Sequence, residues 1–138
     1  MSATGDPAAG FTLLETLTAL ALMALISAIA FPMLDRAAAA AALAQAKAEI
    51  LSDLATARAG AVRVGAPVEF AVAADGGGYA WSPGATRRLP PLVRLQGSQA
   101  PVDFYPDGSA RPAALTLSAG RRSLPISVGA TGLAAAGS

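Results

Sequence analysis

The hydrophobic residues of this chain are concentrated near its N-terminus. Between Phe11 and Leu34 the only charged side chain is Glu15. A helix over this range would be about 36 Å long, which exceeds the roughly 30 Å hydrocarbon core of a bilayer. A soluble helix that is apolar on every face would need a much larger protein around it. The run therefore predicts a membrane-spanning helix over residues 11–34.

A second helical pattern continues from the first over residues 35–62. Its apolar positions are Leu43, Ile50, Leu51, Leu54 and Ala57, and the charged positions on its other faces are Lys47, Glu49, Asp53 and Arg58. This pattern predicts an amphipathic continuation of the same helix, with its apolar stripe facing a core. Pro32 has no backbone N–H and predicts a kink or local break. Gly60, Gly65 and Pro67 predict the end of the helix.

After Pro67 the alternation changes to a period of two, which is typical of half-buried strands. A first strand is predicted at Val68–Val72 and its hairpin partner at Tyr79–Ser82, joined by a turn at Asp75–Gly78. Further strands are predicted at residues 92–95, 102–105, 114–117 and 124–128, with turns at 106–109 and 119–122. The predicted fold class is α+β: a long N-terminal helix packed against a small, mostly antiparallel β-sheet domain over residues 63–138.

Composition restricts the chemistry, because the chain contains no cysteine and no histidine. This excludes thiolate catalysis, imidazole acid–base chemistry, the usual zinc sites and disulfides. The serines have no histidine base, and Asp75, Asp103 and Asp107 lack the close spacing of a calcium loop. We therefore expect no enzymatic activity, no metal and no cofactor.

A short motif opens the apolar run: Gly10-Phe11-Thr12-Leu13-Leu14-Glu15. With Pro32 further along, it resembles the prepilin signature of type IV pilins and type II secretion pseudopilins. The resemblance implies that residues 1–10 are a leader peptide, that a prepilin peptidase cuts between Gly10 and Phe11, and that the new terminal residue is N-methylated. On this interpretation the chain is a substrate of the peptidase, and residues 11–34 form the transmembrane and filament-core helix.

Glu15 lies one turn inside the predicted membrane helix, where a carboxylate costs a few kcal/mol and indicates a function. The resemblance implies that its partner is the ammonium of a cleaved Phe11 in a neighbouring subunit, and it assigns Pro32 to assembly as well. An ion pair in a low dielectric would then select a staggered neighbour, while the apolar helix faces pack. The alternative is that the Glu15 carboxylate snorkels to the membrane interface.

The C-terminal part resembles the globular domain of the GspH/FimT type. The segments that carry this resemblance are Val102-Asp103-Phe104-Tyr105-Pro106-Asp107-Gly108-Ser109, Leu115-Thr116-Leu117 and Ile126-Ser127-Val128-Gly129-Ala130-Thr131-Gly132. In that domain the Phe-x-Pro-Asp-Gly-Ser turn and the closing Thr-Gly lie in a sheet stacked on the helix. The two resemblances together imply a minor pseudopilin, a structural subunit of the type II secretion pseudopilus involved in protein export, with other pseudopilins as partners.

The resemblance also implies a single-pass protein of the bacterial inner membrane, with its C-terminal domain in the periplasm and later in the pseudopilus. Charge does not determine this orientation. Residues 1–10 contain no Lys or Arg, and Arg36 follows the predicted span. The orientation therefore rests on the motif.

Two other functions remain open. A minor type IV pilin used for pilus priming or DNA uptake would share the N-terminal motif, and the arginines after residue 35 could contact phosphates. Relatives implicated in DNA uptake resemble one another in a Gly-Arg-x-Arg ending, however, whereas this chain has Thr131-Gly132-Leu133-Ala134 there, so we do not expect nucleic-acid binding. A secreted binding domain with an ordinary signal peptide would be cleaved within residues 37–42, although the apolar run is longer than the usual one.

Overall fold

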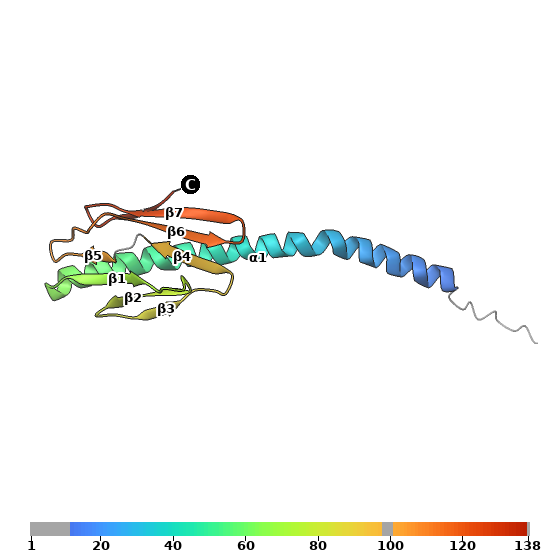
Figure 1. The fold of residues 1–138 in the computed structure, drawn as a ribbon, viewed down its shortest axis with the longest axis horizontal. Coiled ribbons are helices and arrows are strands. Elements are labelled where there is room, and N and C mark those ends of the chain that lie inside the picture. Colours follow the sequence, from blue (N-terminus) through green and yellow to red (C-terminus); the bar gives the residue numbers. More distant parts are fainter. Residues whose placement is uncertain (1–11, 98–100, 138) are drawn as a thin grey trace, which may run out of the picture. The chain divides into compact units, whose positions relative to one another are not determined.

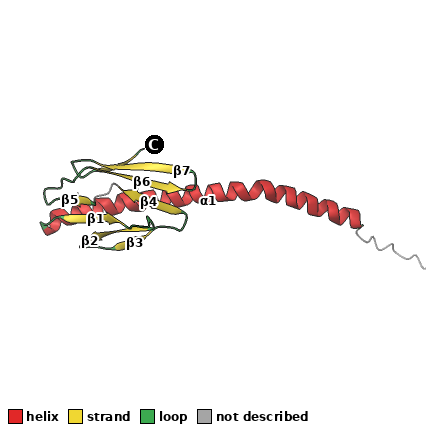
Figure 2. Cartoon of the chain, viewed as in Figure 1, coloured by secondary structure: helices red, strands yellow, loops and turns green. Residues whose placement is uncertain are grey.

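The computed structural model describes residues 12–97 and 101–137. A single helix, α1 (Leu13–Val64), comes first in this part of the chain, and eight strands follow it (Figures 1 and 2). The strands are β1 (Val68–Val72), β2 (Gly78–Ser82), β3 (Thr86–Arg88), β4 (Val93–Gly97), β5 (Val102–Phe104), β6 (Ala113–Ala119), β7 (Arg122–Val128) and β8 (Ala134–Ala136). The chain divides into two compact units, Met1–Arg36 and Ala37–Ser138, and α1 contributes to both.

Pro32 lies inside α1, and the helix continues across it. Of the kink or local break predicted from the sequence, the break is absent, and the kink stays a prediction. A single proline removes one backbone hydrogen bond, and apolar side chains offer the backbone no competing partner, so the remaining ladder holds the helical conformation. The helix ends where the sequence suggests a cap, because Gly65 has a φ of 69° and its N–H donates to the carbonyl of Ala61 at 3.0 Å.

Within the unit Ala37–Ser138, one face of α1 is buried at the three- and four-residue spacing of a helix. The residues of this face are Leu43, Ala46, Ile50, Asp53, Leu54, Ala57 and Ala61. The sequence placed Asp53 and Arg58 on the other faces, and this prediction is wrong. Asp53 is buried and Arg58 is half-buried, because each bonds to groups on the strands and turns that cover the helix.

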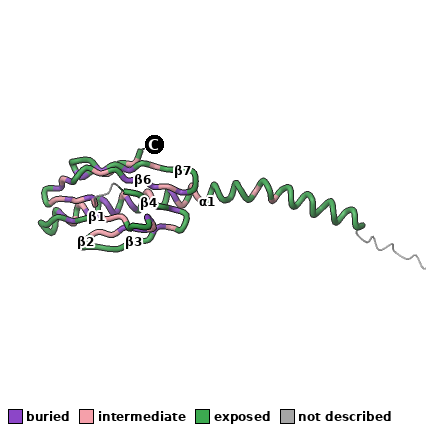
Figure 3. The backbone as a smooth tube through the Cα atoms, in the orientation of Figure 1, coloured by how far each residue is buried: buried purple, intermediate pink, exposed green. Residues whose placement is uncertain are grey.

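The strands form two four-stranded antiparallel sheets, sheet A with the order β3-β2-β1-β5 and sheet B with the order β4-β6-β7-β8. Buried and exposed positions alternate along β4, β6 and β7, and the buried positions of both sheets share one core with α1 (Figure 3). The α+β class with antiparallel pairing is confirmed, but the single small sheet is two sheets. The edge strands β3 and β8 were not predicted, because each has three residues and neither alternates in hydrophobicity.

Candidate functional site

Thr12 caps the N-terminus of α1. Its Oγ1 accepts a hydrogen bond from the backbone N–H of Glu15 at 3.2 Å, and its carbonyl accepts from the N–H of Thr16 at 3.1 Å. Thr12 and Glu15 also have the Thr-x-x-Glu spacing of a capping box, in which the acid sits in the first turn and favours the positive end of the helix dipole. Glu15 therefore has a local structural role that our sequence interpretation missed, although the spacing was visible.

The other polar side chains of the apolar segment are satisfied by their own helix. The hydroxyls of Thr16, Thr18 and Ser27 donate to carbonyls one turn earlier, each at 2.8 Å. The Glu15 carboxylate accepts no hydrogen bond from any residue that the structure describes. The predicted processing residues Gly10 and Phe11 lie outside the described residues, so the predicted pairing of Glu15 stays a prediction.

The apolar segment of α1 exposes its large side chains in this single chain. Among the described residues, α1 is the one helix long and apolar enough to cross a membrane, with a mean hydropathy of 2.2 over its most apolar window and none of that window buried. Leu13, Leu14, Leu17, Leu20, Leu22, Met23, Leu25, Ile26, Ile29, Phe31, Met33 and Leu34 are all exposed by more than half. Such a surface requires lipid or other apolar helices around it.

Arg58 connects α1 to a turn between β5 and β6. Its Nε donates to the carbonyl of Gly108 at 2.8 Å. Asp107 closes the same turn by accepting from the N–H of Ser109 at 2.9 Å and from its Oγ at 2.6 Å. These bonds to Ser109, from the hydroxyl first and then the backbone, hold the pKa of Asp107 below its ordinary value. The Pro-Asp-Gly-Ser segment is therefore a rigid turn seated on α1.

Gly132, in the turn between β7 and β8, packs against the same arginine. Its φ is 73° and that of Gly108 is 81°, conformations that favour glycine. A Cβ on Gly132 would collide with the carbonyl oxygen of Gly108 and would lie 2.6 Å from Nε of Arg58. Two of the segments that carry the resemblance to the GspH/FimT domain thus meet at Arg58, which the sequence alone did not single out.

A second polar contact links sheet A to α1. The hydroxyl of Tyr79 donates to Oδ2 of Asp53 at 2.7 Å, and Nε of Arg87 lies 3.4 Å from the same oxygen. The Tyr79 ring is buried and stacks with Phe70 and Trp81, at centroid distances of 5.0 and 6.3 Å, and these two rings also stack with each other at 6.3 Å. Burial first, and then the bond to Asp53, raise the pKa of Tyr79 far above its ordinary value. The contact gives the buried Asp53 carboxylate a hydrogen-bond donor and a counter-charge.

The raised pKa of Tyr79 gives a testable dependence of stability on pH. The unfolded chain loses this phenolic proton near pH 10 and the folded chain retains it, so this contribution is intact below pH 10 and declines above it. We expect Tyr79→Phe to lower the free energy of unfolding by about 1.5–3 kcal/mol at pH 7, because Asp53 loses a hydrogen bond. The same variant should lose less stability than the wild type between pH 10 and 11. Urea unfolding of the detergent-solubilised full chain, followed by circular dichroism, measures both effects.

Tyr105 supplies the matched control for this experiment. It is only half-buried, and its hydroxyl makes no hydrogen bond within residues 12–97 and 101–137. Tyr105→Phe should therefore leave the free energy of unfolding at pH 7 unchanged. Equal behaviour of the two variants would contradict the role assigned to the contact between Tyr79 and Asp53.

The arginines considered for phosphate binding do not form one surface. Arg87 pairs with Asp53, and Nη2 of Arg111 lies 3.1 Å from Oδ2 of Asp103. The register of sheet B places Arg94 opposite Ser118 and Arg122 opposite Ala119, at one end of the sheet, with Arg121 in the adjacent turn. The structure therefore brings together three of these residues: Arg94, Arg121 and Arg122.

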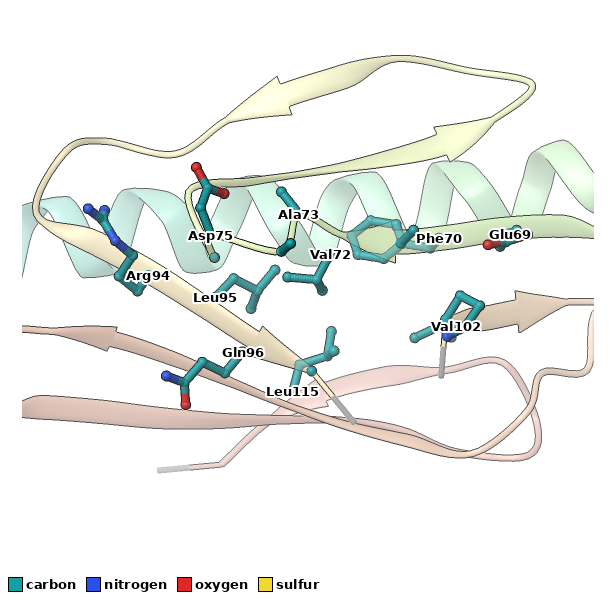
Figure 4. A pocket seen from close by; sticks show the side chains of 15 residues that line it. Glu69, Phe70, Val72, Ala73, Asp75, Arg94, Leu95, Gln96, Val102 and Leu115 are labelled. Atoms are coloured by element: carbon teal, nitrogen blue, oxygen red, sulfur yellow. The ribbon is translucent and has the colours of Figure 1, made fainter. Parts of the chain in front are cut away.

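A groove of about 530 Å³ lies where sheet A meets sheet B, between β1 and β4. Val72, Leu95 and Leu115 point toward one another across it (Figure 4). Its charged lining residues are Glu69, Asp75 and Arg94. The groove is thus lined by both apolar and polar groups.

Comparison with known proteins identifies the family. Residues 46–132 match the model of the type II transport protein GspH family, which is more than half of the chain. The chain belongs to the GspH family. Residues 7–31 match the prokaryotic N-terminal methylation motif, so this GspH chain also carries the N-terminus expected from the prepilin resemblance. The resemblance inferred from the sequence is thereby confirmed.

A solved structure supports the fold of this GspH chain. It is similar to the minor pseudopilin EpsH from the type 2 secretion system of Vibrio cholerae, with a TM-score of 0.51 and 11% sequence identity, over 65% of this chain and 91% of that chain. At this identity the similarity shows the fold and not a shared partner. No curated protein matches the chain.

Proposed function

We propose that this GspH chain is a minor pseudopilin, a structural subunit of a type II secretion pseudopilus. The observation that carries the proposal is the combination in one chain of an N-terminal methylation motif at residues 7–31 and a GspH domain at residues 46–132. The exposed apolar part of α1, most of which lies within the methylation motif, supports membrane anchoring before assembly. The proposed role in export is mechanical, and no catalytic step is assigned to the chain.

Processing is the first proposed step. A prepilin peptidase would remove residues 1–10 by cutting after Gly10, and Phe11 would become the methylated N-terminus. Residues 11–34 would hold the chain in the bacterial inner membrane, with Ala37–Ser138 on the periplasmic side. The capped start of α1 at Thr12 supports this division, because the helix begins immediately after the proposed cleavage site.

Assembly is the second proposed step and involves Glu15 and Pro32. The hydroxyls of Thr16, Thr18 and Ser27 are satisfied within α1, so the Glu15 carboxylate is the group in this segment that gains most from an external cation. We assign that cation to the Phe11 ammonium of a neighbouring pseudopilin. Pro32 frees the carbonyl of Ala28 from its usual intrahelical partner, and we assign this carbonyl to contacts with a packed neighbouring helix.

The N-terminus of the mature protein tests the proposed processing. We expect intact-mass and peptide mass spectrometry of chain purified from membranes with an active prepilin peptidase to show Phe11 as the first residue, carrying one methyl group. A bulky residue at the cleavage site should prevent processing, so Gly10→Val should accumulate as the uncut precursor. The reason is that the peptidase must bring the backbone on both sides of the bond close to its catalytic groups.

Two controls show whether cleavage depends on the peptidase and on the residue at position 10. The wild-type chain expressed without the peptidase should keep residues 1–10, and Gly5→Val, within the same leader, should leave cleavage intact. A mature protein that starts at an alanine within residues 37–42 would identify an ordinary signal peptide. That result would contradict the pseudopilin proposal, because the helix needed for assembly would be lost.

A further inference from the structure

One end of sheet B is strongly basic. The four strands of this sheet contain no acidic residue, and no acidic residue follows Asp107 in the sequence. The charged residues of its strands, Arg94 and Arg122, lie at the same end, and Arg121 lies beside them in the exposed turn between β6 and β7. We call these three residues the arginine end.

Little within the described residues neutralises the arginine end. Arg121 and Arg122 are exposed and make no ion pair there, whereas Arg87 and Arg111 do. The guanidinium of Arg94 donates to the carbonyls of Pro91 and Val93, at 3.0 and 2.9 Å. Asp75 lines the same groove as Arg94, but its carboxylate accepts from the N–H of Gly77 at 2.8 Å.

Within the unit Ala37–Ser138, the turn between β6 and β7 lies toward the N-terminal end of this unit's part of α1 (Figure 1). The hairpin of β6 and β7 has its other end near Arg58, where Gly108 and Gly132 contact this arginine. Seven residues of strand β6 span about 23 Å, which equals about fifteen residues of helix. Because α1 finishes at Val64, shortly after Arg58, the hairpin packs back along α1 toward Leu43.

The unit Ala37–Ser138 begins soon after the apolar segment in the sequence. The predicted span finishes at Leu34, and Ala39 is already packed against the core of the unit. At about 1.5 Å per residue, α1 separates these positions by at most about 8 Å. The headgroup layer on each side of the hydrocarbon core is about 5–8 Å thick, and charges act over about 8 Å at physiological salt.

We propose that the arginine end binds anionic phospholipid headgroups while the chain waits in the membrane. The inference rests on the membrane anchoring in the proposed function, but it does not depend on which leaflet the unit faces. Contact through Arg121 and Arg122 would hold the unit against the bilayer. Extraction of the chain into the filament would break this contact. Basic residues next to a membrane span attract anionic lipid in this way, by about fivefold in the equilibrium for each arginine.

A single-cysteine fluorescence experiment tests this contact, because the chain has no native cysteine. Ser123→Cys labels the arginine end, and Thr131→Cys labels the exposed turn at the opposite end of the hairpin. The full chain is reconstituted in vesicles of phosphatidylcholine, with or without phosphatidylglycerol, that also carry a headgroup-attached quencher. We expect phosphatidylglycerol to increase quenching at position 123 several-fold at low salt, and high salt to abolish the increase. The label at position 131 should not respond.

Charge variants assign the effect to the arginine end. Arg121→Gln in the Ser123→Cys background should reduce the phosphatidylglycerol-dependent quenching about fivefold. Arg63→Gln removes one exposed charge from the last turn of α1, at the opposite end of the unit, and should leave the quenching unchanged. Equal effects of the two variants would overturn the proposal, as would equal quenching in the two kinds of vesicle.

Further outcomes separate the lipid contact from membrane anchoring and from nucleic-acid binding. A chain that fails to float with the vesicles after alkaline washing would contradict the membrane anchoring itself, and the lipid contact with it. A chain that floats but shows no phosphatidylglycerol effect would overturn only the lipid contact. If Arg121→Gln leaves quenching unchanged but weakens retention on a duplex DNA column, the arginine end contacts nucleic acid instead, and the lipid proposal is wrong.

Discussion

Gly132→Ala should destabilise the unit Ala37–Ser138 by about 3–5 kcal/mol and lower its melting temperature by more than about 10 °C. Two costs combine in this estimate. The backbone at Gly132 has a φ of 73°, where an L-residue costs about 1–2 kcal/mol. The added Cβ would also collide with the Gly108 carbonyl and press on the Arg58 guanidinium, which donates to that carbonyl at 2.8 Å. Thermal unfolding of the full chain in detergent, followed by circular dichroism, measures the change.

Gly120→Ala is the matched control, because it separates the two costs. Gly120 has a φ of 58°, and a Cβ there would meet nothing within 4 Å. We expect it to lose only the backbone term, about 1–2 kcal/mol. In an Arg58→Ala background, Gly132→Ala should cost at least about 0.5 kcal/mol less than in the wild type, because one of the two colliding groups has gone. Equal costs for the two glycines would show that the contact with Arg58 contributes nothing.

This contact explains which parts of the fold could be predicted from sequence. Hydrophobic periodicity is a property of neighbouring residues, so it located α1 and six of the strands, including Val68–Val72 with its alternating burial. Asp107-Gly108 was predicted as a turn, and Gly132 was named only as part of the family resemblance. Their meeting at Arg58, fifty residues earlier in the chain than Gly108, is a long-range contact that no local pattern contains.

Asp53 is a second residue whose environment depends on long-range contacts that the sequence pattern does not contain. An acid in an amphipathic helix normally marks the solvent face, and the sequence interpretation placed it there. In the fold, Tyr79 and Arg87 reach the Asp53 carboxylate from β2 and β3, and their bonds permit its burial. The strand that supplies Arg87 was itself not predicted, because it has only three residues and they do not alternate in hydrophobicity. Without that strand the partner of Asp53 could not be anticipated.

The candidate assembly site was the more predictable part, because its signal is local. The methylation motif, the apolar run and the isolated acid all lie within residues 7–34, and the family comparison confirms the motif. What the sequence interpretation missed is that Thr12 and Glu15 form a helix cap. Glu15 can therefore act through its charge on a neighbouring subunit or through its fit to the N-terminus of its own helix. These two roles make different demands on the side chain.

Glu15→Gln should lower the association constant of the mature chain for its sibling pseudopilins by on the order of 100-fold. Co-purification with these siblings should then be lost. The physical reason is the cost, roughly 3 kcal/mol or more, of leaving the Phe11 ammonium of a neighbouring subunit in an apolar environment without a counter-charge. Glutamine keeps the shape of the side chain and is accepted at the same position of a capping box. The measurement is pull-down from detergent-solubilised membranes, normalised to the amount of processed chain.

Three companion variants decide between charge and cap. Glu15→Ala should fail as completely as Glu15→Gln, because both remove the charge. Thr12→Ala removes the capping hydroxyl, worth about 0.5–2 kcal/mol, but keeps the charge, and should therefore still assemble. Glu49→Gln removes an exposed acid from the part of α1 beyond the apolar segment and should have no effect. Full assembly by Glu15→Gln together with failure of Thr12→Ala would mean that Glu15 orders its own helix, and that the cation of the neighbouring subunit is not its partner.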